Sequence, residues 1–236
     1  LRLVAFQGIV RALGDDGLPL LIEALAGPSK ATQMAALRLV PDLAVAGATL
    51  AFSKLLPTLS PPMQVALLNG WEQRPDPPAL ETVAPLLNSP AIEVRLSAIR
   101  ALARVGDETV VLPLVESAAA LGPAQKAARV ALTQMARGDV AARLLALLDD
   151  PRTEVQVEAA RALGERGERR AVTRLLELAR GESTPVRLAA LRALVVLLDE
   201  QQLNALVRLV SEAAGETRRA EAARALTLVY ERLEPK

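Results

Sequence analysis

IEVRLSAIRALARVGD, residues 92–107, is the most informative stretch of this chain about its fold. Arg100 and Arg104 lie on one side of the helix that this stretch predicts, and Gly106 follows it, where a glycine commonly ends a helix. The opposite side is expected to be buried, because apolar side chains recur there at the spacing of one helix face. These residues are Val94, Ala98, Ala101, Leu102 and Val105.

The same pattern comes back along the chain at a nearly fixed interval. It reads VQVEAARALGERGE at residues 155–168 and VRLAALRALVVLLD at residues 186–199. A shorter apolar helix pattern and a turn that contains proline come before each copy. A constant period of this length predicts a solenoid, in which each unit buries its apolar side against the next one. The units begin 30 to 32 residues apart, near Gly17, Ala48, Ala79, Val110, Val140, Ala171 and Leu203.

We therefore expect an all-α fold, an α-solenoid of stacked antiparallel helix pairs. The composition agrees, because 51% of the residues are apolar but only 2% are aromatic, which favours helices rich in Leu and Ala over a sandwich or barrel. One array is expected over residues 1–236, with about seven repeats after a leading half-repeat. The prolines of GWEQRPDPP, residues 70–78, predict a change in curvature there.

Val-Arg opening the second helix of a pair and AxRALxxxGD closing it resemble the HEAT and HEAT-like repeats. The period of about 31 residues is similar to the compact repeats of the phycobilisome lyase type. Residues 59–107 also look like the HEAT arrays of large multidomain exported proteins of planctomycete and verrucomicrobial bacteria. That second resemblance implies a piece of a longer, exported chain; without it, a cytoplasmic location would be expected.

An arginine ladder is the main candidate for a binding site. Each rung falls on the side of a second helix that points away from the buried arc, where guanidinium groups could bind an acidic peptide, a polyphosphate or a nucleic-acid backbone. The alternative is a solvated face whose arginines pair with Glu158, Glu221 and similar neighbours. The rungs are Arg38, Arg100, Arg129, Arg161, Arg192 and Arg224.

An apolar stripe comes four residues before the rungs, with Leu96 and Leu188 as its clearest members. A stripe of this kind beside basic residues is what a groove for an amphipathic partner would present. The alternative is packing between neighbouring second helices.

A second polar column opens the second helices and is expected to be structural. Its long side chains can reach carbonyls and carboxylates of adjacent turns and so fix the register of the stack. The column includes Gln33, Gln64, Arg95, Gln156 and Arg187. Trp71, the only tryptophan, occupies a column that is otherwise aliphatic, so we expect it in the core.

The composition argues against catalysis and against cofactors. The chain has no Cys and no His, which removes thiolate nucleophiles, the commonest metal ligand and the usual general base. Its 28 basic and 27 acidic residues give a formal net charge of +1, which disfavours nucleic acid as a partner. No run approaches the roughly 18 apolar residues of a membrane span.

We therefore expect a noncatalytic scaffold that presents its second-helix side, concave in HEAT-like proteins, to a protein or peptide, and no metal or cofactor. Two enzyme classes with similar repeats stay open. A HEAT-like DNA glycosylase would need a strongly basic face with several aromatic residues. A lyase of the bilin type would need a cavity for its chromophore. Deoxyhypusine hydroxylase, a third HEAT enzyme, uses His-Glu iron ligands that this chain lacks.

Overall fold

The computed structural model describes residues 2–41, 47–71 and 80–234, and these contain helices, turns and no strand. The chain divides into two compact units. Unit 1 comprises Leu1–Ser117 and Leu121–Arg137, and unit 2 comprises Ala118–Ala120 and Gly138–Lys236. The expected break at residues 70–78 lies almost wholly outside the described residues. The single array over residues 1–236 stays a prediction.

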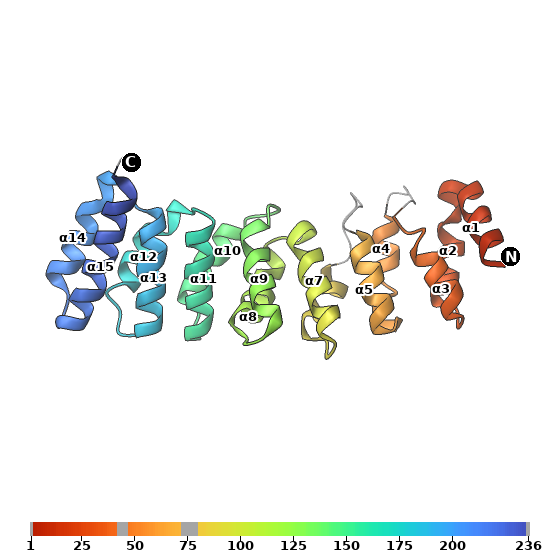
Figure 1. Cartoon of the computed structure of the whole chain (residues 1–236), viewed down its shortest axis with the longest axis horizontal. Helices are drawn as coiled ribbons and strands as arrows, with labels where there is room; N and C mark the ends of the chain where they lie inside the picture. Colours follow the sequence, from red (N-terminus) through yellow and green to blue (C-terminus); the bar gives the residue numbers. More distant parts are fainter. Residues whose placement is uncertain (1, 42–46, 72–79, 235–236) are drawn as a thin grey trace. The chain divides into compact units, whose positions relative to one another are not determined.

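Unit 1 is built from helix pairs, as its sequence predicts (Figure 1). Its first helices are α2 (Leu18–Ala26), α4 (Ala48–Ser53), α6 (Leu80–Val83) and α8 (Val111–Ala119), the last of which ends beyond the unit. Its second helices are α1 (Arg2–Leu13), α3 (Lys30–Leu37), α5 (Pro61–Gly70), α7 (Ile92–Val105) and α9 (Pro123–Gln134). The helix α1 is the leading half-repeat.

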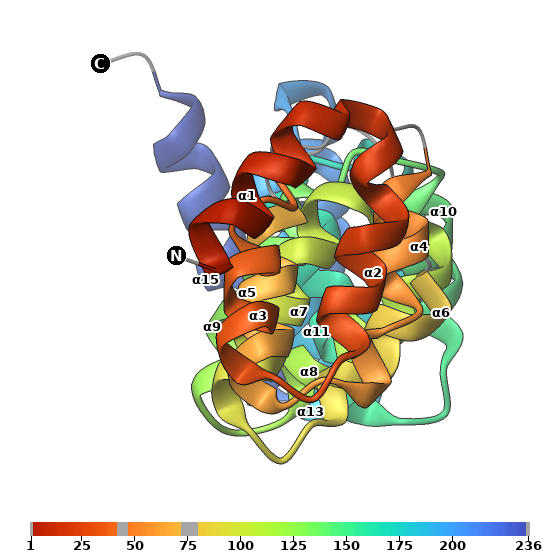
Figure 2. The ribbon, with the colours of Figure 1, turned by 90° about the vertical axis from the view of Figure 1, so that its right-hand side faces the viewer.

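The helices of unit 1 form two layers. The second helices pack in sequence, α1 on α3, α3 on α5, α5 on α7 and α7 on α9, and α2 contacts α4 in the other layer. Figure 2 shows α2 and α4 on one side and α3 and α5 on the other. The apolar side of each helix is thus buried between neighbouring repeats.

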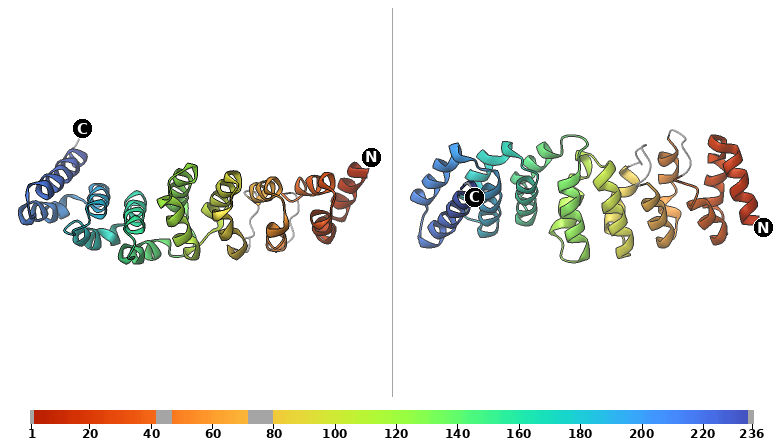
Figure 3. Two further views of the ribbon diagram at one scale, coloured as in Figure 1. Left: turned by 90° about the horizontal axis from the view of Figure 1, so that it is seen from below. Right: turned by 45° about the horizontal axis from the view of Figure 1, so that its top comes forward.

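Unit 2 repeats this arrangement (Figure 3). Its first helices are α10 (Val140–Ala146), α12 (Val172–Leu178) and α14 (Leu203–Glu212). Its second helices are α11 (Thr153–Glu165), α13 (Thr184–Leu197) and α15 (Glu216–Leu233). The helix α13 packs on both α11 and α15, so the second helices again form a continuous layer.

Two first helices of unit 1 are short and are followed by 3-10 segments. The helix α6 ends at Val83, and residues 84–88 form a 3-10 helix. Pro85 explains the change, because its nitrogen has no hydrogen to donate to the preceding turn. Pro57 lies in a similar 3-10 segment after α4, at Leu56–Thr58.

The expected core and the register contacts are confirmed. Leu102 is fully buried and Trp71 is 3% exposed. The glutamines of the second polar column repeat one hydrogen bond, in which each Nε2 donates to the carbonyl oxygen eight residues earlier. That carbonyl lies near the end of α2 for Gln33 and in the 3-10 segments that follow α4 and α10 for Gln64 and Gln156. The bonds are Gln33 to Leu25 at 2.8 Å, Gln64 to Leu56 at 2.9 Å and Gln156 to Leu148 at 3.0 Å.

Ion pairs link neighbouring repeats in unit 2. The bonded partners lie 25 to 36 residues apart in the chain, so each pair joins one repeat to the next. The pairs are Arg174 with Asp149 at 2.5 Å, Arg187 with Glu221 at 2.7 Å, Arg169 with Asp199 and Arg180 with Glu212 at 3.3 Å, Arg170 with Asp139 at 3.4 Å, and Arg218 with Glu182.

Arginine–carboxylate contacts, both within and between repeats, are expected to make unit 2 sensitive to acid. A hydrogen bond from Arg170 lowers the pKa of Glu168, and one from Arg218 lowers the pKa of Glu182. A carboxyl whose pKa is lower in the folded state stabilises that state above its unfolded pKa, and this contribution is lost as the pH falls through the folded pKa. We therefore expect the Tm to fall on acidification from about pH 7 to about pH 3.

Circular dichroism melts of the wild type and of the double variant Glu168→Gln and Glu182→Gln test this expectation. The variant should start from a lower Tm at neutral pH and change less on acidification, because two of the responsible carboxyls are gone. A wild-type Tm that does not fall with pH would contradict the assignment.

Candidate binding surface

The second-helix face is the exposed side of α7 and α9 in unit 1 and of α11, α13 and α15 in unit 2. Of the arginine ladder, Arg100, Arg192 and Arg224 are exposed on this face, whereas Arg129 and Arg161 are half-buried. Arg38 is exposed but follows the last residue of α3, because that helix ends at Leu37, four residues before Pro41. The ladder therefore points away from the core, as expected, but its rungs differ.

One groove lies between α13 and α15 and has a volume of about 780 Å³. Its apolar lining includes Leu188, Leu191, Val195 and Leu228. The structure thus brings three of the expected site residues together here, because Leu188, Arg192 and Arg224 all line this groove. Two carboxylates, Glu216 and Glu221, also line it.

A second groove, the α7/α9 groove, lies in unit 1 and has a volume of about 530 Å³. Arg100 lines it together with two residues that the sequence interpretation did not select, Arg104 and Lys126. Position on the helix could have indicated Arg104, which lies one turn after Arg100 on the same side of α7. Nothing in the repeat pattern indicates Lys126. Leu96 is half-buried and, like Arg129, does not line this groove.

Within unit 2 the ladder is interrupted at α11. Arg161 donates to Glu158 at 2.8 Å and to Glu165 at 2.5 Å, and Glu158 is only 4% exposed. The pairing of the ladder with Glu158 that the sequence suggested as the structural alternative is therefore present at this rung. The Arg161 guanidinium thus pairs with two carboxylates of its own helix, α11.

Close packing accompanies this interruption. Gly164 of α11 lies against α13, and a Cβ atom at this position would come within 2.9 Å of the Cα of Ala193. Only a glycine allows the two backbones to approach this closely.

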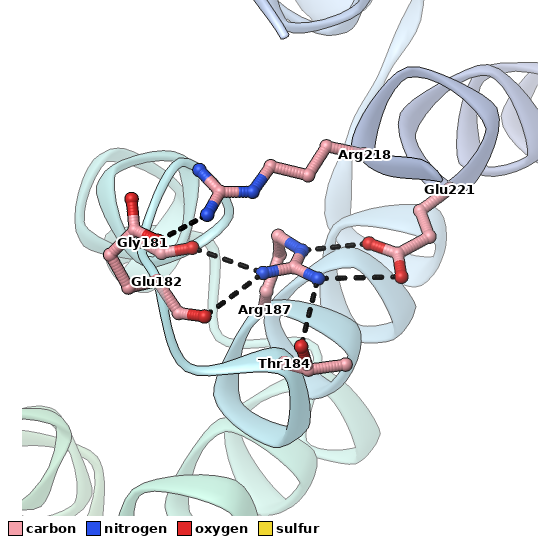
Figure 4. Close-up of polar contacts among 6 residues, drawn as sticks. All are labelled: Gly181, Glu182, Thr184, Arg187, Arg218 and Glu221. Carbon is pink, nitrogen blue, oxygen red and sulfur yellow. Dashed lines mark hydrogen bonds and ion pairs between the residues drawn. The ribbon is translucent and has the colours of Figure 1, made fainter. Parts of the chain in front are cut away.

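Glu221 pairs differently from the sequence-based expectation. It does not pair with the ladder but with Arg187 of the second polar column, whose Nε lies 2.7 Å from its carboxylate (Figure 4). The Arg187 guanidinium also donates to the carbonyl oxygens of Gly181 and Glu182 at 3.2 Å and to the hydroxyl of Thr184 at 3.1 Å. Arg187 is 4% exposed, and its buried guanidinium fastens α15 to α13 through Glu221.

Side chains suited to metal binding do not gather in the described ranges, where no three His, Cys, Asp or Glu residues lie close enough to hold an ion. Asp107 and Asp139 each accept a backbone N–H bond at the start of the next helical segment, so these two carboxylates cap helices. None of the described helices is long and apolar enough to cross a bilayer.

Two family models match the chain. Residues 141–227 match HEAT repeats, and residues 94–122 match the PBS lyase HEAT-like repeat. The matched segments cover most of α7, all of α8 and most of the span from α10 to α15. No curated protein matches the sequence.

Similar solved structures include human deoxyhypusine hydroxylase in complex with glycerol, at 16% identity over 94% of this chain and 98% of that chain, with a TM-score of 0.40. A designed armadillo repeat protein is 20% identical over 90% and 99% of the two chains, with a TM-score of 0.35. An archaeal HEAT-like repeats protein from Thermococcus onnurineus NA1 is 14% identical over 98% and 94%, with a TM-score of 0.34.

Proposed function

We propose that this chain, a HEAT-like repeat protein at residues 94–122 and 141–227, is a noncatalytic interaction module that binds a protein or peptide on its second-helix face. One observation carries the proposal: each unit has a groove between neighbouring second helices where exposed basic side chains flank an apolar floor. Apolar floors provide affinity, and the positive flanks favour acidic partners and speed their encounter.

The noncatalytic part of the proposal is supported by composition. Without His or Cys, the chain would have to use carboxylates, Lys or Tyr for acid-base chemistry, and the same groups or a Ser or Thr hydroxyl as a nucleophile. The carboxylates with lowered pKa, such as Glu168 and Glu182, are bonded to arginines, and this is the opposite of the raised pKa that a general acid needs.

A pull-down compares the intact 236-residue chain with a triple variant, Arg100→Glu, Arg192→Glu and Arg224→Glu. Lysate from the source organism is used at low and at high salt, and bound proteins are quantified by mass spectrometry. Arg161 is left unchanged because its reversal would place a third carboxylate beside Glu158 and Glu165. We expect a partner that binds the wild type and is lost from the triple variant and at high salt.

A matched control makes the same change in charge on the first helices. Lys54, Arg143 and Arg208 are exposed basic residues in or directly after α4, α10 and α14. Their replacement by glutamate should leave capture of the partner unchanged. If the triple variant still captures the partner, or if both variants lose it equally, the second-helix face is not the binding face. Recovery of nucleic acid would support the glycosylase alternative instead.

A further inference from the structure

We propose that the α7/α9 groove binds an acidic amphipathic helix of a partner protein. This inference rests on the proposed function and names the site and the class of ligand within it. The two walls of the groove are parts of one compact unit, so the site is complete within unit 1.

The floor of the groove is apolar and made largely of small residues. Ile99, Ala103 and Ala131 are at most 9% exposed, while Ala127 is half-buried and Val130 is 45% exposed. The alanines leave a trough between the helices that this unit does not fill, and its volume of about 530 Å³ is in the range of roughly 300–1,000 Å³ for ligand sites. Apolar side chains of a partner would be removed from water there.

The charge on both walls has one sign. Arg100 and Arg104 of α7 lie on one wall and Lys126 of α9 on the other, and all three side chains are exposed. No carboxylate is among the described residues that line this groove. The complementary ligand is therefore acidic on both of its flanks.

These two features together favour a helix over an extended peptide. An amphipathic helix has an apolar stripe with polar side chains on each side, so its stripe can face the floor while carboxylates reach both walls. Successive side chains of an extended strand point alternately toward the floor and toward solvent, which leaves few of them to meet the walls. Arg100 and Arg104 are four residues apart, which is about 6 Å along the axis of α7. Two carboxylates four residues apart on a helical ligand have the same spacing and can each reach one of these arginines.

The groove between α13 and α15 does not have the same electrostatic character. Glu216 and Glu221 contribute negative charge to it beside Arg192 and Arg224, although Glu221 is paired with Arg187. We therefore expect an acidic helix to prefer the α7/α9 groove.

Selection from a random peptide library tests the preference without assuming a sequence. Displayed peptides of about 16 residues, long enough for roughly four helical turns, are selected on the intact chain and counter-selected on the double variant Arg104→Glu and Lys126→Glu. We expect the enriched peptides to combine an apolar stripe at helical spacing with Asp or Glu on both sides of it. The inference is overturned if the enriched peptides lack this pattern, or if no peptide binds the intact chain better than it binds the double variant.

Fluorescence anisotropy with the enriched peptides then locates their site. Arg104→Glu with Lys126→Glu should weaken binding by about tenfold or more, because two attractions become repulsions. Ala127→Leu should also weaken it, since the added side chain fills the trough without changing charge and with only a small change in helix propensity. Circular dichroism confirms that each variant is folded. A proline in the middle of the peptide should abolish binding if the bound form is helical.

A control variant separates this inference from the proposed function. Arg192→Glu with Arg224→Glu changes the other groove by the same charge and should leave peptide affinity unchanged. If only this variant weakens binding, the α7/α9 inference fails while the second-helix face stands as the binding face. If neither variant weakens binding, both proposals fail.

Discussion

Replacement of Leu102 by aspartate is expected to unfold unit 1 at room temperature. Leu102 is fully buried in α7, which packs on α5, α9 and the 3-10 segment after α6. An aspartate there would bury a carboxylate with no partner, a change in the class that removes about 4–5 kcal/mol or more of stability. That loss is a large part of the total stability of a typical domain.

Denaturant titration followed by circular dichroism measures this effect. Leu102→Met is the matched control, because it keeps the volume and apolar character and should lower stability by less than about 1.5 kcal/mol. If Leu102→Asp unfolds at the same denaturant concentration as the wild type, residue 102 is not in the core and the register assigned to α7 is wrong.

Replacement of Arg187 by methionine is expected to destabilise the last two repeats by about 3–5 kcal/mol. Methionine keeps much of the length of the side chain but removes every donor. The Glu221 carboxylate, 17% exposed, would lose its guanidinium, and the carbonyl oxygens of Gly181 and Glu182 would lose the hydrogen bonds that it supplies. Removing one partner of a buried ion pair destabilises a protein more than replacing both partners by apolar residues, because it leaves a buried charge without compensation.

Arg219 provides the control for this change. It occupies the equivalent position at the start of α15, 32 residues later, but it is exposed. Arg219→Met should alter stability by no more than about 0.5 kcal/mol. Glu221→Gln, alone and together with Arg187→Met, completes a double-mutant cycle, and the double variant should lose less than the sum of the single losses. Additive losses would show that Arg187 and Glu221 do not interact in solution.

Periodicity alone located most of the fold. The first helices of the later repeats begin within one residue of the breaks read from the sequence, as α10 does at Val140 and α14 at Leu203. Helical spacing likewise placed Leu102 in the core and Arg100 on the surface. Both results follow because the buried side of a helix repeats every few residues and leaves a direct record in the sequence.

The binding surface was less predictable because it depends on contacts between repeats. A column of aligned arginines suggested equivalent rungs, yet Arg161 is held by Glu158 and Glu165 while Arg192 lines a groove. The distance between second helices depends on single residues such as Gly164, and the period does not encode it. The pairing of Glu221 with Arg187 rather than with a rung is also a matter of geometry across two repeats.

Hydrogen exchange of the chain, free and bound to its partner or to a selected peptide, locates the binding surface. We expect binding to slow exchange in the second helices around the grooves, in α7 and α9 or in α13 and α15, and to leave the first helices α10, α12 and α14 unchanged. Protection confined to the first helices would contradict the assignment of the second-helix face as the binding surface.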